Sequence, residues 1–180
     1  MRKELLNRFY CFSIPGIMIG IVLITILWGL LRKRLEEKRL VLWISFILFL
    51  CGFTVILYIT LGNRNVGSKN EICLIPLYSY VQALRGGNPE IYRSNFMNVI
   101  LFYPVGLLAT SLLPQKWKGW CRFILVVLAL TAVSVGIEFL QYRYALGRCE
   151  IDDVIHNALG ALLGSLAFVC SMYFLEKKKP

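Results

Sequence analysis

Residues 134–164 read SVGIEFLQYRYALGRCEIDDVIHNALGALLG, and this stretch joins two apolar segments through a polar centre. The polar centre contains the side chains of Glu138, Gln141, Arg143, Arg148, Glu150, Asp152, Asp153, His156 and Asn157. A charged side chain inside an apolar helix costs about 2.5 kcal/mol or more on insertion scales, so it normally faces a partner or a wet cavity. The polar centre is therefore the predicted functional region.

The composition indicates that the whole chain is a membrane protein. Hydrophobic residues make up 58% of its 180 residues, whereas soluble domains contain about 45–50% apolar residues. A helix of about 20 residues crosses a hydrocarbon core of about 30 Å. Runs of about this length occupy residues 10–31, 40–62, 96–113, 123–142 and 154–175. The predicted fold class is all-α, a polytopic transmembrane bundle of about five spanning helices.

The first apolar run resembles a secretory signal in its basic flank, but it is too long and no small-residue cleavage site follows it. We therefore expect it to remain as a helix. Residues 1–62 are predicted to form two N-terminal transmembrane helices, and residues 63–180 a core with three more.

The longest connection, residues 63–94, contains the apolar patch ICLIPLYSYVQAL at residues 72–84. Connections of this length are more often functional than structureless. The apolar spacing in the patch predicts an amphipathic helix at the membrane interface, which ends at the Gly-Gly-Asn-Pro turn that follows. Such a helix would lie on the same membrane face as Arg148, where it would form a lid.

The distribution of basic residues predicts how the chain is oriented in the cell membrane. If residues 32–39 and the C-terminal lysines are cytoplasmic, eleven Lys and Arg residues lie inside and nine outside. This favours a multi-pass protein with its N-terminus outside and its C-terminus inside. The net charge of +10 is then explained by anionic lipid headgroups rather than by nucleic acid.

Two asparagines, Asn95 and Asn98, share one face at the start of the run 96–113. In one interpretation Asn95 caps this helix and Asn98 bonds a neighbouring helix. In the other, Asn98 lines the same polar pocket as Glu138. The sequence leaves both interpretations open.

Polar residues mark one face of each of the last two predicted helices. Ser134, Glu138 and Gln141 form a stripe at spacings of four and three. An intramembrane carboxylate such as Glu138 is a functional candidate, although it can also serve a buried hydrogen-bond network. Asp152 or Asp153 can cap the following helix, yet one cap would suffice.

The last predicted helix has two further features. Gly160 and Gly164 form a small-xxx-small pair, which predicts close approach of another helix on the face that carries Asp153 and Asn157. His156 is the sole histidine, and a structural hydrogen bond is a more common role for a lone histidine than catalysis.

The cysteines do not have metal-binding spacing. Six cysteines are present without a C-x-x-C pair. Cys73 and Cys149 fall in connections that share one membrane face, so a disulfide between them is left open. Its geometric tolerance is narrow.

The sequence resembles the VanZ-like family in three blocks, which read NVILFYPVGLL, GIEFLQ and GRCEIDDVIHNALGALLG. The likeness covers residues 74–165. Cys73 stands where the family pattern has an asparagine, and Leu77 where it has an aromatic residue. The resemblance implies a small polytopic membrane protein, because the family's founding member is a membrane protein associated with reduced susceptibility to teicoplanin. The family residues at issue are Pro76, Asn98, Phe102, Pro104, Gly106, Glu138, Gln141, Arg148, Asp153, Asn157 and Gly160.

The leading hypothesis is recognition of an anionic cell-envelope lipid, such as a polyprenyl-linked precursor, or of a glycopeptide-type ligand, which contributes to teicoplanin tolerance. Arg148 would contact a phosphate or carboxylate bidentately. No cofactor is predicted. The ligand-binding candidates are Asn98, Glu138, Gln141, Arg148, Asp152, Asp153 and Asn157.

Two alternatives remain. The chain could be a membrane enzyme in which Glu138 is the general base, while Asp152, Asp153 and His156 hold a divalent metal over a lipid pyrophosphate. It could also be a structural or partner-binding subunit whose polar residues join helices. The oligomeric state and the identity of the ligand are left open.

Overall fold

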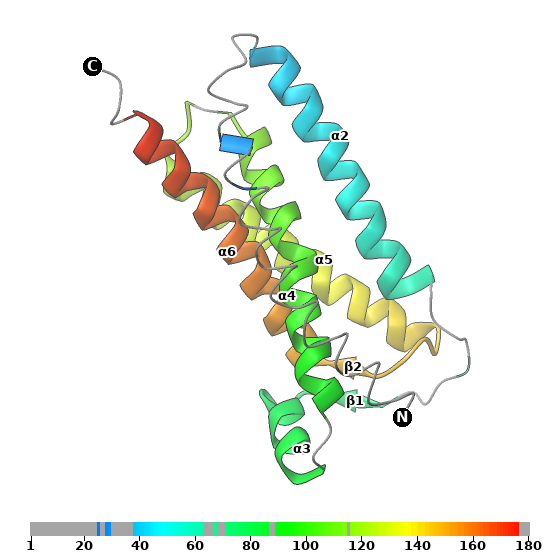
Figure 1. The fold of residues 1–180 in the computed structure, drawn as a ribbon. Helices are drawn as coiled ribbons and strands as arrows, with labels where there is room; N and C mark the ends of the chain where they lie inside the picture. The colour runs from blue at the N-terminus through cyan, green and yellow to red at the C-terminus, as the bar shows by residue number, and fades with distance from the viewer. Residues whose placement is uncertain are drawn as a thin grey trace, which may run out of the picture.

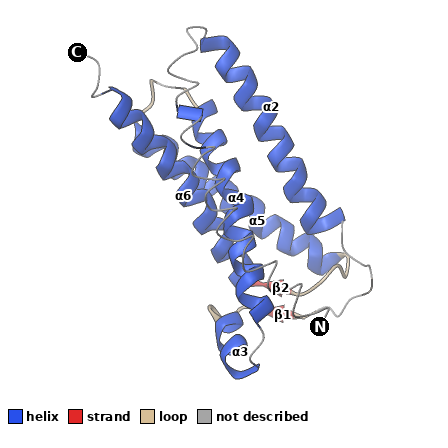
Figure 2. Cartoon of the chain, viewed as in Figure 1, coloured by secondary structure: helices blue, strands red, loops and turns tan. Residues whose placement is uncertain are grey.

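A computed structural model of the chain describes residues 25, 28, 29, 38–62, 67, 71–86, 89–114 and 116–176. This part of the chain is almost entirely helical, so the predicted all-α class is confirmed (Figures 1 and 2). Its long helices are α2 (Lys38–Leu57), which continues into the π-helical turn η1 (Tyr58–Gly62), then α4 (Pro89–Leu112), α5 (Gly119–Arg143) and α6 (Ile151–Glu176). Its shorter elements are β1 (Ile72–Cys73), α3 (Tyr78–Gly86) and β2 (Cys149–Glu150).

Four helices in the described residues are long and apolar enough to cross a membrane. They span Arg39–Gly62, Ile91–Leu112, Gly119–Arg143 and Ile151–Tyr173, in agreement with four of the five predicted runs. Large apolar side chains such as Trp43, Leu128 and Phe139 point outward, which suits contact with lipid. The chain is therefore a membrane protein. The remaining predicted run, residues 10–31, lies outside the described residues except for Thr25, Trp28 and Gly29.

Helices α4 and α6 form the closest pair in the bundle, because glycines let their backbones meet. A side-chain carbon at Gly164 would overlap the carbonyl oxygen of Tyr103, and one at Gly160 would overlap that of Val99. Gly106 of α4 has the same relation to Ala161 of α6. The predicted close approach at the small-xxx-small pair is confirmed.

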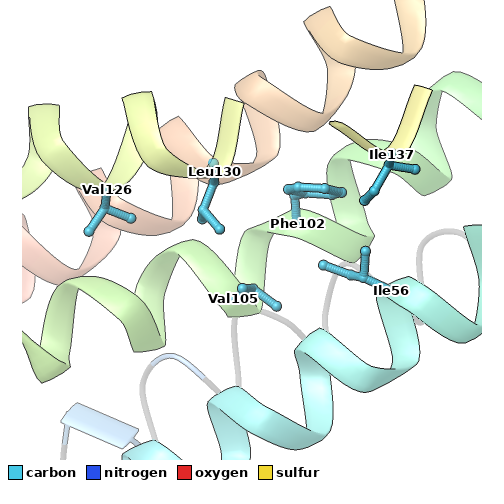
Figure 3. Packing of buried hydrophobic residues seen from close by; sticks show 7 residues of the cluster. Ile56, Phe102, Val105, Val126, Leu130 and Ile137 are labelled. Atoms are coloured by element: carbon cyan, nitrogen blue, oxygen red, sulfur yellow. The ribbon is translucent and has the colours of Figure 1, made fainter. Parts of the chain in front are cut away.

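Apolar side chains from all four long helices meet in the centre of the bundle (Figure 3). Ile56 of α2 and Phe102 of α4 point toward Ile137 of α5, and Phe102 is fully buried. A second buried cluster lies around Phe168 of α6 and includes Trp28. Helix α2 therefore shares its core with the later helices.

One end of the bundle carries α3 and a two-stranded parallel ladder, next to the end of α5 and the start of α6 (Figures 1 and 2). In the ladder Ile72 lies opposite Cys149, and Cys73 lies opposite Glu150. The helix predicted within residues 72–84 is present, but it begins only at Tyr78. Its first residues pair as a strand instead, because Pro76 and the positive φ of 61° at Leu77 break the backbone between them.

Substitution of Gly164 by alanine tests the α4–α6 contact. We expect Gly164→Ala to lower the free energy of unfolding by about 1–3 kcal/mol or more, because the added methyl group meets backbone that cannot move aside. Thermal unfolding of the purified protein in detergent measures the change. Gly136→Ala is the matched control, since no atom lies within 4 Å of a side-chain carbon there. Equal stability of the two variants would contradict this packing.

Candidate functional site

Arg148 lies directly before β2 and joins the flanks of the two strands. Its Nε atom lies 3.2 Å from Oε2 of Glu71, and its Nη1 atom lies 3.2 Å from Oε1 of Glu150. The side chains of Arg148 and Glu71 are 38% and 51% exposed. Exposed ion pairs contribute about 0–1 kcal/mol, so these partners hold the guanidinium only weakly.

Asp152, in the first turn of α6, caps the start of α3. Its Oδ1 atom accepts a hydrogen bond from the Leu77 amide at 2.5 Å, and its Oδ2 atom accepts one from the Ser79 amide at 2.8 Å. These amides precede or begin a helix and would otherwise lack partners. The sequence suggested a cap for the helix that contains Asp152. Its buried carboxylate instead orders a helix that lies more than 70 residues earlier.

His156 forms a second tether to α3. Its Nδ1 atom lies 2.5 Å from the carbonyl oxygen of Asp152, and its Nε2 atom lies 2.7 Å from the hydroxyl of Tyr80. A carbonyl can only accept, so Nδ1 carries a proton, and in the neutral imidazole Nε2 accepts from the hydroxyl of Tyr80. Asn95 adds a third tether, because its Nδ2 atom donates to Oγ of Ser79 at 2.9 Å. The histidine therefore has the structural role that is usual for a lone histidine.

Beneath the ladder, buried amide and carboxyl groups connect the long helices. Each of the following hydrogen bonds joins two elements: Asn98 Nδ2 to Asp153 Oδ1 at 2.8 Å, Glu150 N to Glu138 Oε2 at 2.9 Å, Asn157 Nδ2 to Ser134 Oγ at 2.8 Å, and Gln141 Nε2 to the Thr60 carbonyl at 3.0 Å. Glu138, Gln141 and Asn157 are buried. Asn98 thus bonds a neighbouring helix, as one of the two interpretations required. The other part of that interpretation is wrong, because α4 already begins at Pro89 and Asn95 lies within it instead of capping it.

The thiol of Cys149 lies in the field of both Glu138 and Asp153. Burial raises the pKa of the Cys149 thiol above its usual range, and the carboxylates of Glu138, Asp153 and Glu150 raise it further. Both intramembrane acids therefore act on one thiol at the base of the ladder. Asn98 is bonded to Asp153, and the interpretation in which Asn98 lines a polar pocket with Glu138 stays a prediction.

Two buried acceptors of this cluster lack donors. The Oε1 atom of Gln141 and the Oδ1 atom of Asn157 are buried without a hydrogen-bond partner. With the carboxylates of Glu138 and Asp153 nearby, the interior of the site suits a hydroxyl or ammonium donor rather than an anion. Arg148 supplies positive charge at the same end of the bundle, at the edge of the ladder, which we call the rim of the site.

The two cysteines of the ladder do not pair, since Cys73 and Cys149 are both free thiols. Cys73 lies opposite Glu150 rather than opposite Cys149. Successive side chains of a strand point to opposite faces, so the two thiols lie on opposite faces of the ladder. This geometry disfavours the disulfide that the sequence left open.

The structure brings together only part of the predicted site. The charges of Glu138 and Asp153 both act on Cys149, and Asn98 bonds Asp153. Gln141 and Asn157 bond to η1 and α5 respectively. Arg148 belongs to the rim and Asp152 to the base of α3. Sequence reasoning missed Thr60, Glu71, Ser79, Tyr80 and the effect of the acids on Cys149. The amphipathic pattern of residues 72–84 indicated a helix near Tyr80, but no local signal marks Thr60.

Removal of the Asp152 carboxylate should release α3. In Asp152→Ala we expect amide hydrogen exchange of residues 77–86 to accelerate by about tenfold, because loss of a helix cap costs about 1–2 kcal/mol. Hydrogen-exchange mass spectrometry measures this effect, with Arg143→Ala at the same end as the control. Unchanged exchange in residues 77–86 would show that Asp152 does not hold the helix.

Alkylation of Cys149 tests the negative field at the base of the ladder. In a variant whose other cysteines are replaced by serine, Glu138→Gln should speed alkylation at fixed mildly alkaline pH by about two- to threefold. Loss of one charge lowers the pKa of the thiol and raises the thiolate fraction. The control is Glu71→Gln, whose carboxylate does not act on this thiol. A rate that is the same in both variants would place Glu138 away from Cys149.

Comparisons with known proteins agree with this architecture. A model of the VanZ/LLP1 family matches residues 39–173, which extends the likeness of residues 74–165 to include α2. The chain is also 31% identical over 115 residues to Protein VanZ of Enterococcus faecium, covering 62% of this chain and 68% of that protein. No solved structure matches. Because the family match covers most of the chain and all four described spans, the chain belongs to the VanZ/LLP1 family.

Proposed function

We propose that this membrane protein recognises an anionic, lipid-linked ligand of the cell envelope and thereby contributes to tolerance of glycopeptides such as teicoplanin. The observation that supports this proposal is the position of Arg148. The guanidinium flanks the β1–β2 ladder, and β1 leads into a run of exposed apolar side chains. A positive group beside an apolar surface suits an amphiphile with a negative head.

The guanidinium of Arg148 can exchange its partners for a ligand. A phosphate accepts two parallel hydrogen bonds from one arginine, and such charge-assisted pairs are about twice as strong as neutral ones. The competing carboxylates of Glu71 and Glu150 lie 3.2 Å from the guanidinium, and its Nε atom, although near Glu71, makes no hydrogen bond. A ligand phosphate that displaces Glu71 would therefore gain more than the displaced pair loses.

The apolar part of the ligand would lie along the segment between β1 and α3. Leu74 is 66% exposed, and Ile75 and Leu77 are also exposed. Leu84 on α3 is 78% exposed. Side chains of this kind are stable at the boundary between headgroups and acyl chains, where each buried CH₂ contributes about 0.8 kcal/mol. A polyprenyl or acyl tail would meet the same surface.

The acceptor-rich interior suggests what the head of the ligand carries besides phosphate. Glu138 and Asp153 would repel a phosphate, so they do not bind it directly. The unpartnered oxygens of Gln141 and Asn157 require donors. Sugar hydroxyls or an amine would supply them. A polyprenyl-linked envelope precursor combines an apolar tail, phosphate and sugar hydroxyls, and it is the partner that we propose.

The metal-dependent enzyme alternative has less support. Both oxygens of Asp152 bind amides of the α3 start, and both ring nitrogens of His156 have partners. The described residues contain no group of three His, Cys, Asp or Glu side chains with a geometry that would hold a metal ion. Glu138 as a general base remains a hypothesis.

We further propose that the end of the bundle with α3 and the ladder faces the outside of the cell, with the N-terminus outside and the C-terminus inside. Among the described residues, five basic residues lie at the opposite end, near the starts of α2 and α5, and four lie at the α3 end; the first group is Lys38, Arg39, Lys116, Lys118 and Arg122, and the second is Arg85, Arg93, Arg143 and Arg148. Basic residues at that end favour a cytoplasmic location for it.

Native mass spectrometry tests the proposed recognition. The protein is purified from its own membrane, and wild type is compared with Arg148→Ala and with Arg143→Ala, which removes an exposed arginine at the same end. We expect wild type and Arg143→Ala to retain a discrete anionic polyprenyl-type lipid. Arg148→Ala should retain it at least about tenfold less, since a charge-assisted bidentate contact is worth about 1.5–3 kcal/mol.

Cells that express the same three proteins are compared for teicoplanin susceptibility. Arg148→Ala should abolish the added tolerance and Arg143→Ala should keep it, at equal amounts of folded protein. If all three proteins carry only bulk phospholipid, lipid-ligand recognition is wrong, and the polar residues are better explained as contacts between helices.

A further inference from the structure

The connection between α4 and α5 lies at the end of the bundle opposite α3 (Figure 1). Residues 116–122 read KWKGWCR. Trp117 and Trp120 are exposed, as are Lys116 and Lys118. Alternation of tryptophan with basic residues is typical of a segment at the headgroup level of a bilayer, where the basic side chains meet anionic lipids.

Arg122 differs from its basic neighbours because it is buried, with only 6% of its surface exposed. Its guanidinium carbon lies 5.7 Å from the centre of the Phe168 ring on α6. Its Nε and Nη1 atoms are buried and have no hydrogen-bond partner. A buried guanidinium that lacks an anion costs several kcal/mol, and a cation–π contact in a desolvated site offsets about 2 kcal/mol of this cost.

Two further features near Arg122 in the described part of the chain also offer donors without acceptors. Trp28 belongs to the same buried cluster as Phe168, and its indole Nε1 is buried without a partner. Helix α5 begins at Gly119, and Lys118 before it provides no side-chain cap. The first turn of α5 contains no acidic residue. One end of the bundle therefore presents three sets of donors: the amides at the start of α5, the Nε and Nη1 atoms of Arg122, and the indole of Trp28.

We propose that Arg122 and the start of α5 bind the phosphate group of an anionic phospholipid headgroup. Arginine is the side chain best suited to a phosphate in a partly dehydrated site, and the helix start adds free amides and a favourable dipole. The exposed lysines and tryptophans of residues 116–120 would hold the rest of the headgroup. This site does not rest on the proposed function. Helix α5 has 25 residues, so its two ends lie about 37 Å apart.

Titration of the full chain with defined lipids tests the site. The protein in neutral maltoside micelles receives phosphatidylglycerol, phosphatidylcholine or inorganic phosphate, and bound lipid is followed by native mass spectrometry and by the unfolding temperature. We expect saturable binding of phosphatidylglycerol, which raises the unfolding temperature. Arg122→Gln should weaken this binding at least about tenfold, and Arg122→Lys should weaken it less, because lysine keeps the charge but not the planar fork.

Arg39→Gln is the matched control, because it removes an exposed arginine at the same end of the bundle. It should change the affinity less than about twofold, as expected for a screened surface charge. Since Arg122→Gln can affect folding, Lys118→Gln provides a second test at an exposed position and should weaken binding about two- to threefold.

The outcomes separate the sources of the phosphate. Saturable binding of inorganic phosphate that depends on Arg122 would support the anion site and assign it to free phosphate rather than lipid. Binding that falls equally in Arg39→Gln and Arg122→Gln would reflect general attraction to a basic surface and overturn the proposal. The proposal would also be overturned if Arg122→Gln changed the unfolding temperature by the same amount with and without phosphatidylglycerol. Arg122 would then serve the fold alone.

Discussion

The carboxylate of Asp152 holds the polar end of this bundle together. By accepting the amides of Leu77 and Ser79 it ties the start of α3 to the first turn of α6. Because β1 ends only four residues before Leu77 in the chain, the same contact helps to keep β1 beside β2. Arg148 then lies against both strands, and the amide of Glu150 reaches Glu138. The rim and the interior of the candidate site thus depend on one cap.

The lipid bilayer explains why the buried polar groups matter at each end of the bundle. A spanning helix has no water to satisfy its side chains, so each buried polar group needs a partner inside the bundle. At the α3 end the unmatched atoms are two acceptors, on Gln141 and Asn157, and one donor, the Nε atom of Arg148. At the other end they are donors alone, on Arg122 and Trp28. The α3 end therefore offers both kinds of group to the ligand that we propose, and the other end offers donors that suit the phosphate that we propose there.

Features set by local spacing could be predicted from the sequence. The four described spans, the stripe of Ser134, Glu138 and Gln141, and the close approach at Gly164 all follow from helical periodicity and residue size. Features that depend on contacts between distant residues could not be predicted from the sequence. A strand of two residues has no sequence pattern, and the role of Asp152 depends on a tertiary contact. The burial of Arg122 depends on the position of Phe168, which lies on another helix.

We propose that Arg148 exchanges a carboxylate for the anionic head of a ligand. The affinity of the Glu71→Gln variant for that ligand tests this exchange most directly. Glu71 competes for the guanidinium at 3.2 Å, so its neutralisation should strengthen binding of an anionic polyprenyl lipid by about threefold, as the loss of an exposed ion pair allows. An unchanged or weaker affinity would contradict the claim, because Glu71 and Arg148 would then form a structural pair that no ligand displaces.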